Sequence, residues 1–444
     1  MNRGFKEAGY RLLLKEDVPF RSFREKSPRT MEAYRADGGY ESLIKVIRQK
    51  KPAEVLEEIQ KSGLRGRGGA GYPAWRKWEM VSAKEESPKY LCVNGAEEEP
   101  GTFKDRVLLR TNPHQLLEGA LIAALTVGAS VIYLYINRKF SEELKGMAAA
   151  LAAARGERFW GEDILGSRRN IDVIIFPSPV AYVAGEETAM LEVIEGRRPA
   201  PRQKPPFYPV HNGLYGKPTL VNNVETLSHV PHILRMGGEA YRKIGVADSS
   251  GTSLFSLTGN VNNPGVYELP MGTPLRQLID DLGGGLSGSG KLKAVFPGGP
   301  SCGLIGGDDL DANLDYEALK KRGTAFGTGA VIAFDDETCL VNAGLHITEF
   351  FSEESCGQCP PCKMGGKHLA DLHQKIESGH GEMEDLQSIE QICSVVKGRG
   401  YCSLITGASV TVESLVRNFR EEYENHIQTG KCGMKSGQIM QNID

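Results

Sequence analysis

Apolar side chains recur at helical spacing near the start of the chain, and further on helix-like runs alternate with strand-like ones. Residues 41–61 predict two helices, the second beginning at Pro52 and ending at Gly63, because proline favours the first helical position and glycine the position after the last. From about 89 to 245 the alternation predicts an α/β layer with a largely parallel sheet. The strand-like runs are 90–94, 131–136 and 171–176, and the helical runs are 113–127 and 141–154.

The pattern changes after Ser249-Ser250-Gly251. Strand-like and helical runs mixed with glycine-rich turns predict a small α+β domain, and from about 336 onward the pattern is helical. The α+β runs are 254–261, 265–269, 275–282 and 294–296, and the clearest later helices are 341–351, 368–376 and 415–423. We therefore expect three units, at 1–245, 246–335 and 336–444.

A nearly uncharged stretch at 116–136 has the length of a membrane span. Glu118 interrupts it, and Gly128 divides it into a helical half and a half rich in β-branched residues. A buried helix followed by a buried strand explains this division better than a span does.

Composition and charge narrow the function classes. The 444 residues carry a formal net charge of −3 and only short basic clusters, so nothing favours a nucleic-acid partner. The first 20 residues mix charges throughout and lack the apolar core of a secretory signal. Nine cysteines in a large chain without such a signal indicate reduced thiols in the cytoplasm, available to a metal, rather than a disulfide framework.

The strongest chemical signal is a cysteine triplet. Cys356, Cys359 and Cys362 form two consecutive Cys-x-x-Cys spacings, which place three thiolates where they can bind three corners of an iron–sulfur cubane. Gly357 and the prolines at 360–361 suit a loop around an inorganic core rather than a continuing helix. By spacing alone, either Cys393 or Cys402 can supply the fourth ligand.

The alternative for the triplet is a zinc site. A Cys₄ or Cys₃His site could include His368 or His373. Zinc sites usually pair two separate Cys-x-x-Cys units, whereas a consecutive triplet is more typical of iron–sulfur binding. We therefore favour the cluster.

A glycine-dense loop at 63–73 contains a formal G-x-G-x-x-G. A dinucleotide fingerprint should follow a strand, but here a predicted helix precedes the loop, so the ordinary Rossmann interpretation fails. Closely spaced glycines still let backbone N–H groups approach an anion or a flat ring. The loop is surrounded by positive charge suited to phosphate, from Arg65, Arg67, Arg76 and Lys77; a flexible surface loop is the alternative.

Several longer motifs together resemble one family, the NADH-binding flavoprotein subunit of complex I. The glycine loop, with Lys77 and Trp78 behind it, looks like the FMN loop of that family. Further motifs follow in the family's order, at 97–106, 185–189, 204–207, 216–219, 222–226, 264–268 and 354–356. The similarity therefore covers residues from about 38 to 425.

The resemblance implies a fold of three parts within an overall α/β class. These parts are a Rossmann-like FMN- and NADH-binding α/β domain with an N-terminal helical segment (1–245), a ubiquitin-like, SLBB-type α+β domain (246–335), and a C-terminal helical bundle that carries a [4Fe–4S] cluster (336–444).

The resemblance also assigns site residues position by position. The implied cluster ligands are Cys356, Cys359, Cys362 and Cys402, the last because 398–402 resembles the family's fourth-ligand segment. FMN would be held by Gly66, Arg67, Gly68, Lys77, Asn94, Glu97, Tyr182, Gly185, Glu186, Asn222 and Asn223. NADH would meet Tyr72 and Phe207 as aromatic surfaces for adenine, with Glu99, Glu187 and Lys204 nearby.

Two of these assignments have plain alternatives. A lone Tyr72 or Phe207 would more often be a core residue, but their place beside the glycine loop and Lys204 favours an adenine surface. Glu187 could be an ordinary carboxylate at a helix start, stabilised by the helix dipole. The family role makes it an acceptor for ribose hydroxyls whose charge disfavours a 2′-phosphate.

The implied reaction is hydride transfer from NADH to FMN, followed by single-electron transfer to the [4Fe–4S] cluster. Because the flavin performs this chemistry, no catalytic side chain is predicted. The implied partners are a thioredoxin-like [2Fe–2S] subunit and a larger iron–sulfur subunit of the same complex. Membrane contact, on the cytoplasmic face of the inner membrane, would come only through these partners.

Two other interpretations stay open. Ala96 stands where the family usually has an aspartate, which fits a divergent branch: a diaphorase subunit of an NAD-linked hydrogenase, formate dehydrogenase or electron-bifurcating complex. A zinc-stabilised scaffold without a redox role is a third interpretation, from another class, and it predicts zinc and no flavin.

Overall fold

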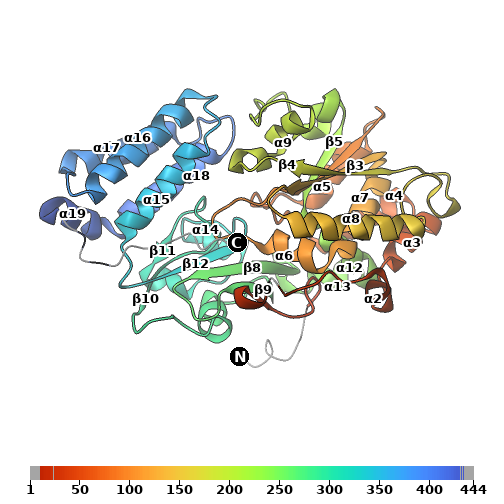
Figure 1. Cartoon of the computed structure of the whole chain (residues 1–444), viewed down its shortest axis with the longest axis horizontal. Coiled ribbons are helices and arrows are strands. Elements are labelled where there is room, and N and C mark those ends of the chain that lie inside the picture. Colours follow the sequence, from red (N-terminus) through yellow and green to blue (C-terminus); the bar gives the residue numbers. More distant parts are fainter. Residues whose placement is uncertain (1–10, 24, 431, 433, 435–444) are drawn as a thin grey trace.

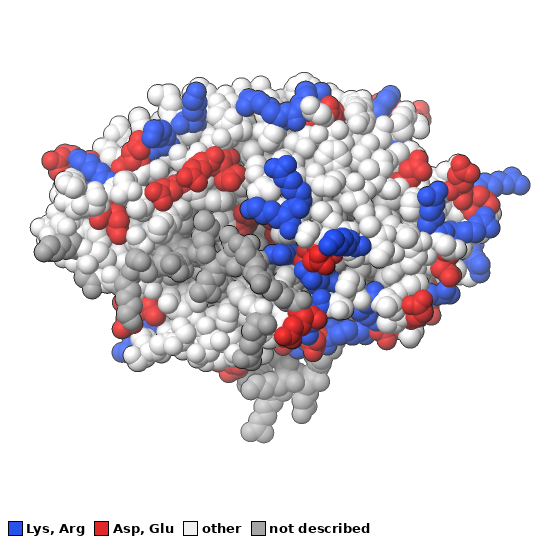
Figure 2. All heavy atoms as spheres, viewed as in Figure 1, with Lys and Arg blue, Asp and Glu red and all other residues white. Residues whose placement is uncertain are grey.

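The structure, a computed structural model, describes residues 11–23, 25–430, 432 and 434. Figure 1 shows a parallel sheet with its helices at one end of the molecule and a helical bundle at the other, with a second sheet below and between them. Basic and acidic side chains are interspersed over the described part of the face in Figure 2, in keeping with the small net charge.

Four parallel strands form the first sheet, in the order β4-β3-β2-β5. Their carboxyl ends therefore lie along one edge, which is where ligand sites of open α/β sheets form. The strands are β2 (Tyr90–Gly95), β3 (Val131–Asn137), β4 (Asp172–Ser178) and β5 (Thr219–Asn223).

The helices around this sheet begin and end at the predicted signals. The helix α4 (Pro52–Ser62) starts at a proline, and Gly63 follows it with a φ of 67°. The helix α7 (Pro113–Val127) is buried at every residue, and Gly128 ends it with a φ of 77°. The apolar stretch at 116–136 is thus a buried helix followed by β3, as predicted, and no helix among the described residues is long and apolar enough to span a membrane.

The remaining helical segments of this unit cover the sheet and lead into and out of it. They are α1 (Phe20–Phe23), α2 (Met31–Ala36), α3 (Glu41–Arg48), α5 (Ala74–Ser82), α6 (Lys104–Thr111), α8 (Ser141–Gly156), η1 (Ile164–Gly166), η2 (Tyr182–Gly185), α9 (Glu187–Ile194), α10 (Pro209–Asn212), η3 (Leu214–Gly216), α11 (Val224–Ser228), α12 (Val230–Met236) and α13 (Gly238–Arg242).

The second sheet is mixed, with the order β1-β9-β8-β12-β10-β11, and only β12 and β8 pair in parallel. Its first strand comes from the N-terminal segment, far from the others in sequence. The strands are β1 (Val18–Pro19), β8 (Thr252–Gly259), β9 (Gly265–Pro270), β10 (Leu292–Phe296), β11 (Ile305–Gly306) and β12 (Ala330–Asp335). Beside it lie η4 (Gln277–Leu282), η5 (Gly307–Asp311), α14 (Tyr316–Lys321) and the small pair β6 (Gly245–Val246) and β7 (Ser249–Ser250).

Both faces of the second sheet are buried. Along β10, Ala294 and Phe296 join the core of the helical bundle, whereas Val295 between them joins a separate core with η4 and α14. The alternation follows from the two-residue period of a strand. The second sheet therefore fixes the helical bundle to the rest of the molecule through one of its faces.

The helical bundle contains α15 (Leu340–Glu353), α16 (Pro360–Glu377), α17 (Met383–Val396), α18 (Leu404–Asn418) and α19 (Arg420–Thr429). The predicted single helix at 415–423 is wrong, because the chain breaks at Phe419, whose φ of −132° is not helical. The Phe419 ring packs over the Lys293 ammonium and toward Gly306, contacts with the second sheet that a local pattern does not reveal.

The prediction that the cysteine triplet lies wholly in a loop also needs correction. Pro360 and Pro361 are the first residues of α16, so Cys362 lies in the first turn of that helix. Proline is compatible with this position because the first helical N–H groups have no partner within the helix.

Candidate functional site

The glycine loop is held between the edge of the parallel sheet and α14. A Cβ on Gly68 would lie 3.0 Å from the Cβ of Asn223, at the carboxyl end of β5. A Cβ on Gly71, whose φ is +60°, would lie 2.7 Å from the ring of Tyr316. Tyr316 also donates a hydrogen bond of 3.2 Å to the carbonyl of Gly66. The loop is therefore packed rather than a flexible surface turn, and Gly71 leaves no room for a side chain.

Two arginines of this loop, Arg65 and Arg67, contact residues between 250 and 316. The Arg67 guanidinium is buried and donates to the carbonyls of Ser250 and Thr252, at 2.8 and 3.2 Å. The Arg65 guanidinium lies 3.9 Å from the centre of the Tyr316 ring. The sequence predicts that these charges are available to phosphate. In the structure they instead bind the loop to Ser250, Thr252 and Tyr316.

The predicted flavin residues of β2 and β5 meet at the carboxyl edge of the sheet. Asn94 and Asn223 are paired across the two strands, and the Asn94 amide donates to the Gly185 carbonyl at 2.7 Å. Asn222 accepts a hydrogen bond of 2.8 Å from the indole of Trp78. This edge thus brings the glycine loop, β2, β5 and the segment around Gly185 together.

Glu97 follows β2 at the same edge. Its carboxylate accepts the backbone N–H groups of Asp105 and Arg106, both at 3.0 Å, and so caps α6. Burial and the neighbouring Asp105 carboxylate raise the pKa of Glu97. Ala96, the residue that departs from the family pattern, is buried in an apolar cluster that also contains Met190.

Two carboxylates and two lysines form a compact charged cluster at the start of α9. Lys204 bridges Glu186 and Glu187, at 2.8 and 3.1 Å, and Lys77 contacts Glu187 at 2.8 Å. Burial would raise the pKa of Glu187, but the charges of Lys77 and Lys204 outweigh it and the pKa is lowered. Glu187 is therefore ionised at neutral pH. Glu186 caps α9 through the N–H groups of Thr188 and Ala189.

Tyr182 and Glu99 are joined directly, since the Tyr182 hydroxyl donates to the Glu99 carboxylate. Ser301 also donates to Glu99, from its N–H at 3.1 Å and from its hydroxyl at 2.6 Å. Burial raises the pKa of Glu99 against these hydrogen bonds. Sequence reasoning missed Ser301, because about 200 residues and a change of domain separate it from Glu99 and no motif connects them.

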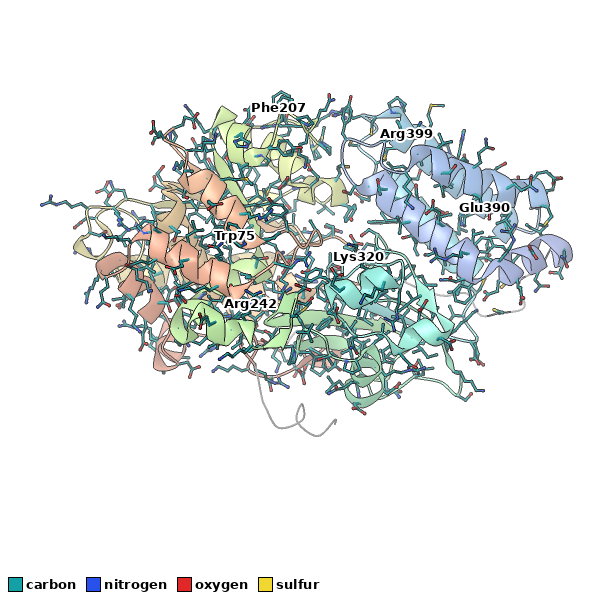
Figure 3. The ribbon with its side chains drawn as sticks, turned by 180° about the vertical axis from the view of Figure 1, so that it is seen from behind. Trp75, Phe207, Arg242, Lys320, Glu390 and Arg399 are labelled. Carbon is teal, nitrogen blue, oxygen red and sulfur yellow. The ribbon has the colours of Figure 1, made fainter. Side chains whose placement is uncertain are left out.

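The two predicted adenine-stacking residues, Tyr72 and Phe207, are exposed by 39% and 41%. This excludes the alternative that they are core residues. Phe207 lies on the rim that faces the helical bundle (Figure 3) and lines an open pocket of about 620 Å³. Tyr401 and Gln358 line the same pocket from the bundle side.

Cys356 and Cys359 lie between α15 and α16, Cys362 lies in the first turn of α16, and Cys402 lies just before α18. Burial raises the pKa of the Cys402 thiol to about 11, and the charges of Glu186, Cys362 and Cys356 add to this effect. The pKa of Cys362 is raised by burial and by Cys359 and Cys356. Cys402, from a second segment, thus lies near enough to Cys356 and Cys362 for their charges to affect its pKa.

The other candidate ligands lie elsewhere. Cys393 is buried in α17, where burial raises the pKa of its thiol to about 12 and the neighbouring charges are Glu413, Lys397 and Glu390. Both ring nitrogens of His373 are engaged, by the Leu369 carbonyl and the Tyr423 hydroxyl. His368 is exposed on α16.

Three hydrogen bonds connect the cysteine loop to the first unit. The Tyr182 N–H donates to Glu354 at 2.7 Å, immediately before the triplet. Arg198 donates to the carbonyl of Cys356 at 3.2 Å, and Gln358 donates to the carbonyl of Pro201 at 2.9 Å. The cysteines thus adjoin the segment that carries the predicted flavin and NADH residues.

Family models match most of the chain. Residues 59–232 match the Nuo51 FMN-binding domain, residues 254–305 the SLBB domain, and residues 342–426 the NADH-ubiquinone oxidoreductase-F iron–sulfur binding region. The second F subunit of the NADH-quinone oxidoreductase of Rhizobium meliloti (strain 1021) is 43% identical over 402 residues, 90% of this chain and 95% of the relative. The corresponding F subunit of Streptomyces coelicolor is 42% identical over 91% of this chain and 89% of the relative.

The chain belongs to the family of NADH-quinone oxidoreductase F subunits. A crystal structure of an NAD⁺-reducing [NiFe]-hydrogenase in the H₂-reduced state is also similar, with a TM-score of 0.80 and 32% identity over 90% of this chain and 67% of that chain. The family resemblance, the fold class and the FMN and [4Fe–4S] cofactors predicted from the motifs are confirmed.

The residues of this member of the family fit both cofactors. The glycine loop lies close against Asn223, with 3.0 Å between a Cβ on Gly68 and the Asn223 Cβ, and amide groups of Asn94 and Asn223 stand at the same edge. Three thiols stand in the triplet and Cys402 lies near enough for Cys356 and Cys362 to affect its pKa, a donor set that suits an iron–sulfur cluster. The individual FMN, NADH and cluster contacts stay predictions.

Proposed function

We propose that this chain is the electron-input flavoprotein of an NADH-oxidising respiratory-type complex. The observation that carries the proposal is the contact between the two predicted cofactor regions: Tyr182, from the flavin segment, donates its N–H to Glu354, which precedes the cysteine triplet. Bound FMN would supply hydride acceptance and release of single electrons, and a [4Fe–4S] cluster would supply one-electron carriage.

In this scheme the protein's own residues bind and orient FMN and NADH. The glycine loop and the carboxyl edge of the parallel sheet would hold FMN, and the exposed rings of Tyr72 and Phe207 offer flat surfaces to the adenine of NADH. Lys77 and Lys204 keep Glu187 ionised and fixed, so that it can accept hydrogen bonds from ribose hydroxyls. Cys356, Cys359, Cys362 and Cys402 would ligate the cluster.

Anaerobic purification followed by cofactor analysis tests the proposal. We expect one FMN, four irons and four sulfides per chain, because the residues present suit these two groups. A preparation without flavin and iron would remove the redox role and leave the scaffold interpretation.

Glu187→Gln is expected to relax the preference for NADH over NADPH by about tenfold in kcat/KM, or about 1.4 kcal/mol. The substitution removes one negative charge and leaves Lys77 and Lys204 beside the ribose site, which favours a 2′-phosphate. The readout is steady-state kinetics of the flavin-loaded protein with a small artificial acceptor. Glu192→Gln, on the same helix but paired with Arg197 and Arg202, is the control. An unchanged NADH/NADPH ratio in Glu187→Gln contradicts this role.

For partners, we propose a thioredoxin-like [2Fe–2S] subunit and a larger iron–sulfur subunit, with the complex at the cytoplasmic face of the inner membrane. The similarity to F subunits of NADH-quinone oxidoreductases supports this assembly. The likeness to the hydrogenase chain favours a second candidate, a diaphorase subunit of an NAD-linked hydrogenase. Activity of the intact complex with quinone, compared with hydrogen or ferredoxin, separates the two.

A further inference from the structure

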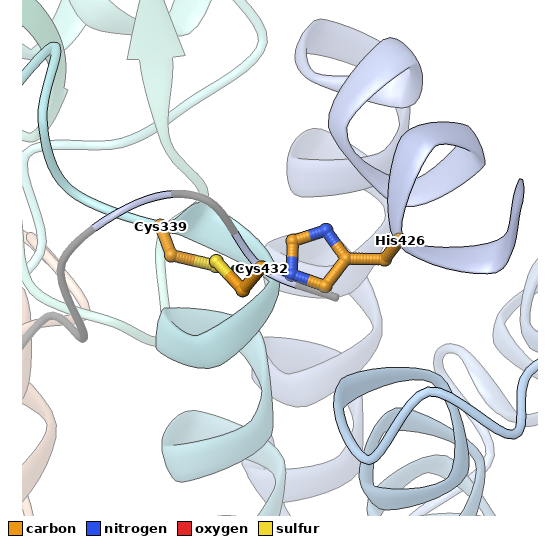
Figure 4. A group of neighbouring side chains, drawn as sticks. All are labelled: Cys339, His426 and Cys432. Atoms are coloured by element: carbon orange, nitrogen blue, oxygen red, sulfur yellow. Dashed lines mark hydrogen bonds between the residues drawn. The ribbon is translucent and has the colours of Figure 1, made fainter. Parts of the chain in front are cut away.

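A second group of potential metal ligands lies at the opposite end of α15 from the cysteine triplet. The Sγ atoms of Cys339 and Cys432 and a ring nitrogen of His426 all lie within 4.8 Å of one another. Figure 4 shows the three side chains pointing toward a common centre, from the start of α15, the end of α19 and the segment after it. Cys339 and His426 are buried and Cys432 is partly buried.

The contacts of His426 direct one ring nitrogen toward the Cys339 sulfur. Its Nδ1 lies 2.8 Å from the Glu422 carbonyl oxygen, which can only accept, so Nδ1 carries the proton. Nε2 lies 3.5 Å from the Cys339 sulfur and 3.5 Å from a Glu377 carboxylate oxygen, so a metal ion that displaces its proton can bind there. A carbonyl that fixes the tautomer in this way is the usual outer-shell partner of a metal-binding histidine.

The surroundings of Cys339 and Glu377 also suit a cation. The Cys339 sulfur accepts the N–H of Asn342 at 3.2 Å at the first turn of α15, so its lone pairs face the other two groups from a fixed position. Glu377 places a carboxylate oxygen 3.5 Å from His426 Nε2. That oxygen is buried and faces His426, while the other oxygen of Glu377 accepts from Asn342 at 3.0 Å.

We propose that Cys339, His426 and Cys432 bind a structural zinc ion, with Glu377 as the fourth ligand. Two thiolates and an imidazole are donors that select zinc over magnesium, calcium or manganese. A disulfide between Cys339 and Cys432 would use the two sulfurs alone, whereas zinc would also use the His426 nitrogen and the Glu377 oxygen that lie beside them. The zinc is additional to the iron–sulfur cluster, since the 14 residues of α15 separate the two sites by roughly 20 Å.

A metal at this place would join the first and last helices of the bundle. Cys339 precedes α15, His426 lies in α19, and Cys432 follows α19. The site would hold the segment after α19 against the entry of the bundle. Local sequence patterns do not reveal it, because Cys339 lies 87 residues before His426.

Metal analysis of the full-length, cofactor-loaded protein tests the site. We expect about one zinc per chain after desalting against a chelator, together with the iron and sulfide of the cluster, and an X-ray absorption spectrum with two Zn–S distances of about 2.3 Å. Cys432→Ser, outside the helices and partly exposed, should lose the zinc and keep its iron, sulfide and flavin. The matched control, Cys393→Ser in α17, should keep its zinc.

Two results would overturn the proposal. One is wild-type protein without zinc in which peptide mapping under non-reducing conditions finds a Cys339–Cys432 disulfide or two free thiols. The other is a Cys432→Ser protein that retains the full zinc content. Neither result bears on the proposed redox function, which depends on flavin and iron, so the two proposals fail separately.

Discussion

Cys402→Ala should lose most of its iron and sulfide while it keeps its flavin, and electron delivery from NADH to the rest of the complex should fall by on the order of 100-fold or more. The reason is that Cys402 alone joins the triplet from a second segment, just before α18. Reduction of a small acceptor that takes electrons at the flavin should persist. Iron, sulfide and flavin analysis and the two activities are the measurements.

Cys393→Ala is the matched control for Cys402→Ala. Cys393 is also a cysteine of the bundle, and it is more deeply buried, but its charged neighbours are Glu413, Lys397 and Glu390 rather than the triplet. It should therefore retain the iron. If Cys393→Ala lost the iron and Cys402→Ala kept it, the assignment of the fourth ligand would be reversed.

The parts of the fold that could be predicted are those with signals inside their own sequence. Pro113 and Gly128 mark the two ends of α7, and the helix occupies the predicted residues between them. The motifs likewise identified the family and both cofactors, because long strings of residues in order are specific. In these regions local propensity and the final structure agree.

The parts that could not be predicted depend on contacts between distant segments. The break between α18 and α19 arises where Phe419 packs on the second sheet. The inward turn of Arg67 depends on carbonyl groups about 180 residues away, at Ser250 and Thr252. The sequence shows that a charged or aromatic side chain is present, but only the folded structure shows which residues it contacts.

A buried charge network beneath the predicted flavin edge shows the same dependence. Lys104 contacts Asp105 at 2.9 Å and Glu225 at 2.8 Å, and all three side chains are almost fully buried. Glu225 in turn accepts from the Leu254 N–H, in the second sheet, at 2.9 Å. Burial would raise the pKa of Glu225, but Lys104, together with His229 and Arg67, outweighs burial and lowers the pKa to about 2. Lys104 therefore stabilises the contact between α11, which carries Glu225, and β8 of the second sheet, which carries Leu254.

Lys104→Met should lower the free energy of unfolding by about 3–5 kcal/mol, because it removes the ammonium group that contacts two buried carboxylates. Thermal and denaturant unfolding measure the loss. The exposed Lys61→Met, which removes a surface pair with Glu57, should change stability by less than about 1 kcal/mol. Adding Glu225→Gln to Lys104→Met should recover part of the loss.

The pH dependence of Lys104→Met separates this electrostatic cause from a simple packing defect. In the wild type, the depressed pKa of Glu225 contributes stability that is present above its unfolded pKa near 4.5 and lost only as the pH falls toward 2. Without Lys104, burial dominates and raises the pKa of the buried carboxylates above the unfolded value. The folded variant then binds more protons than the unfolded chain, so its stability rises as the pH is lowered from 8 to 5. The difference in the free energy of unfolding between variant and wild type should become smaller as the pH falls from 8 to 5. A packing defect would leave that difference constant.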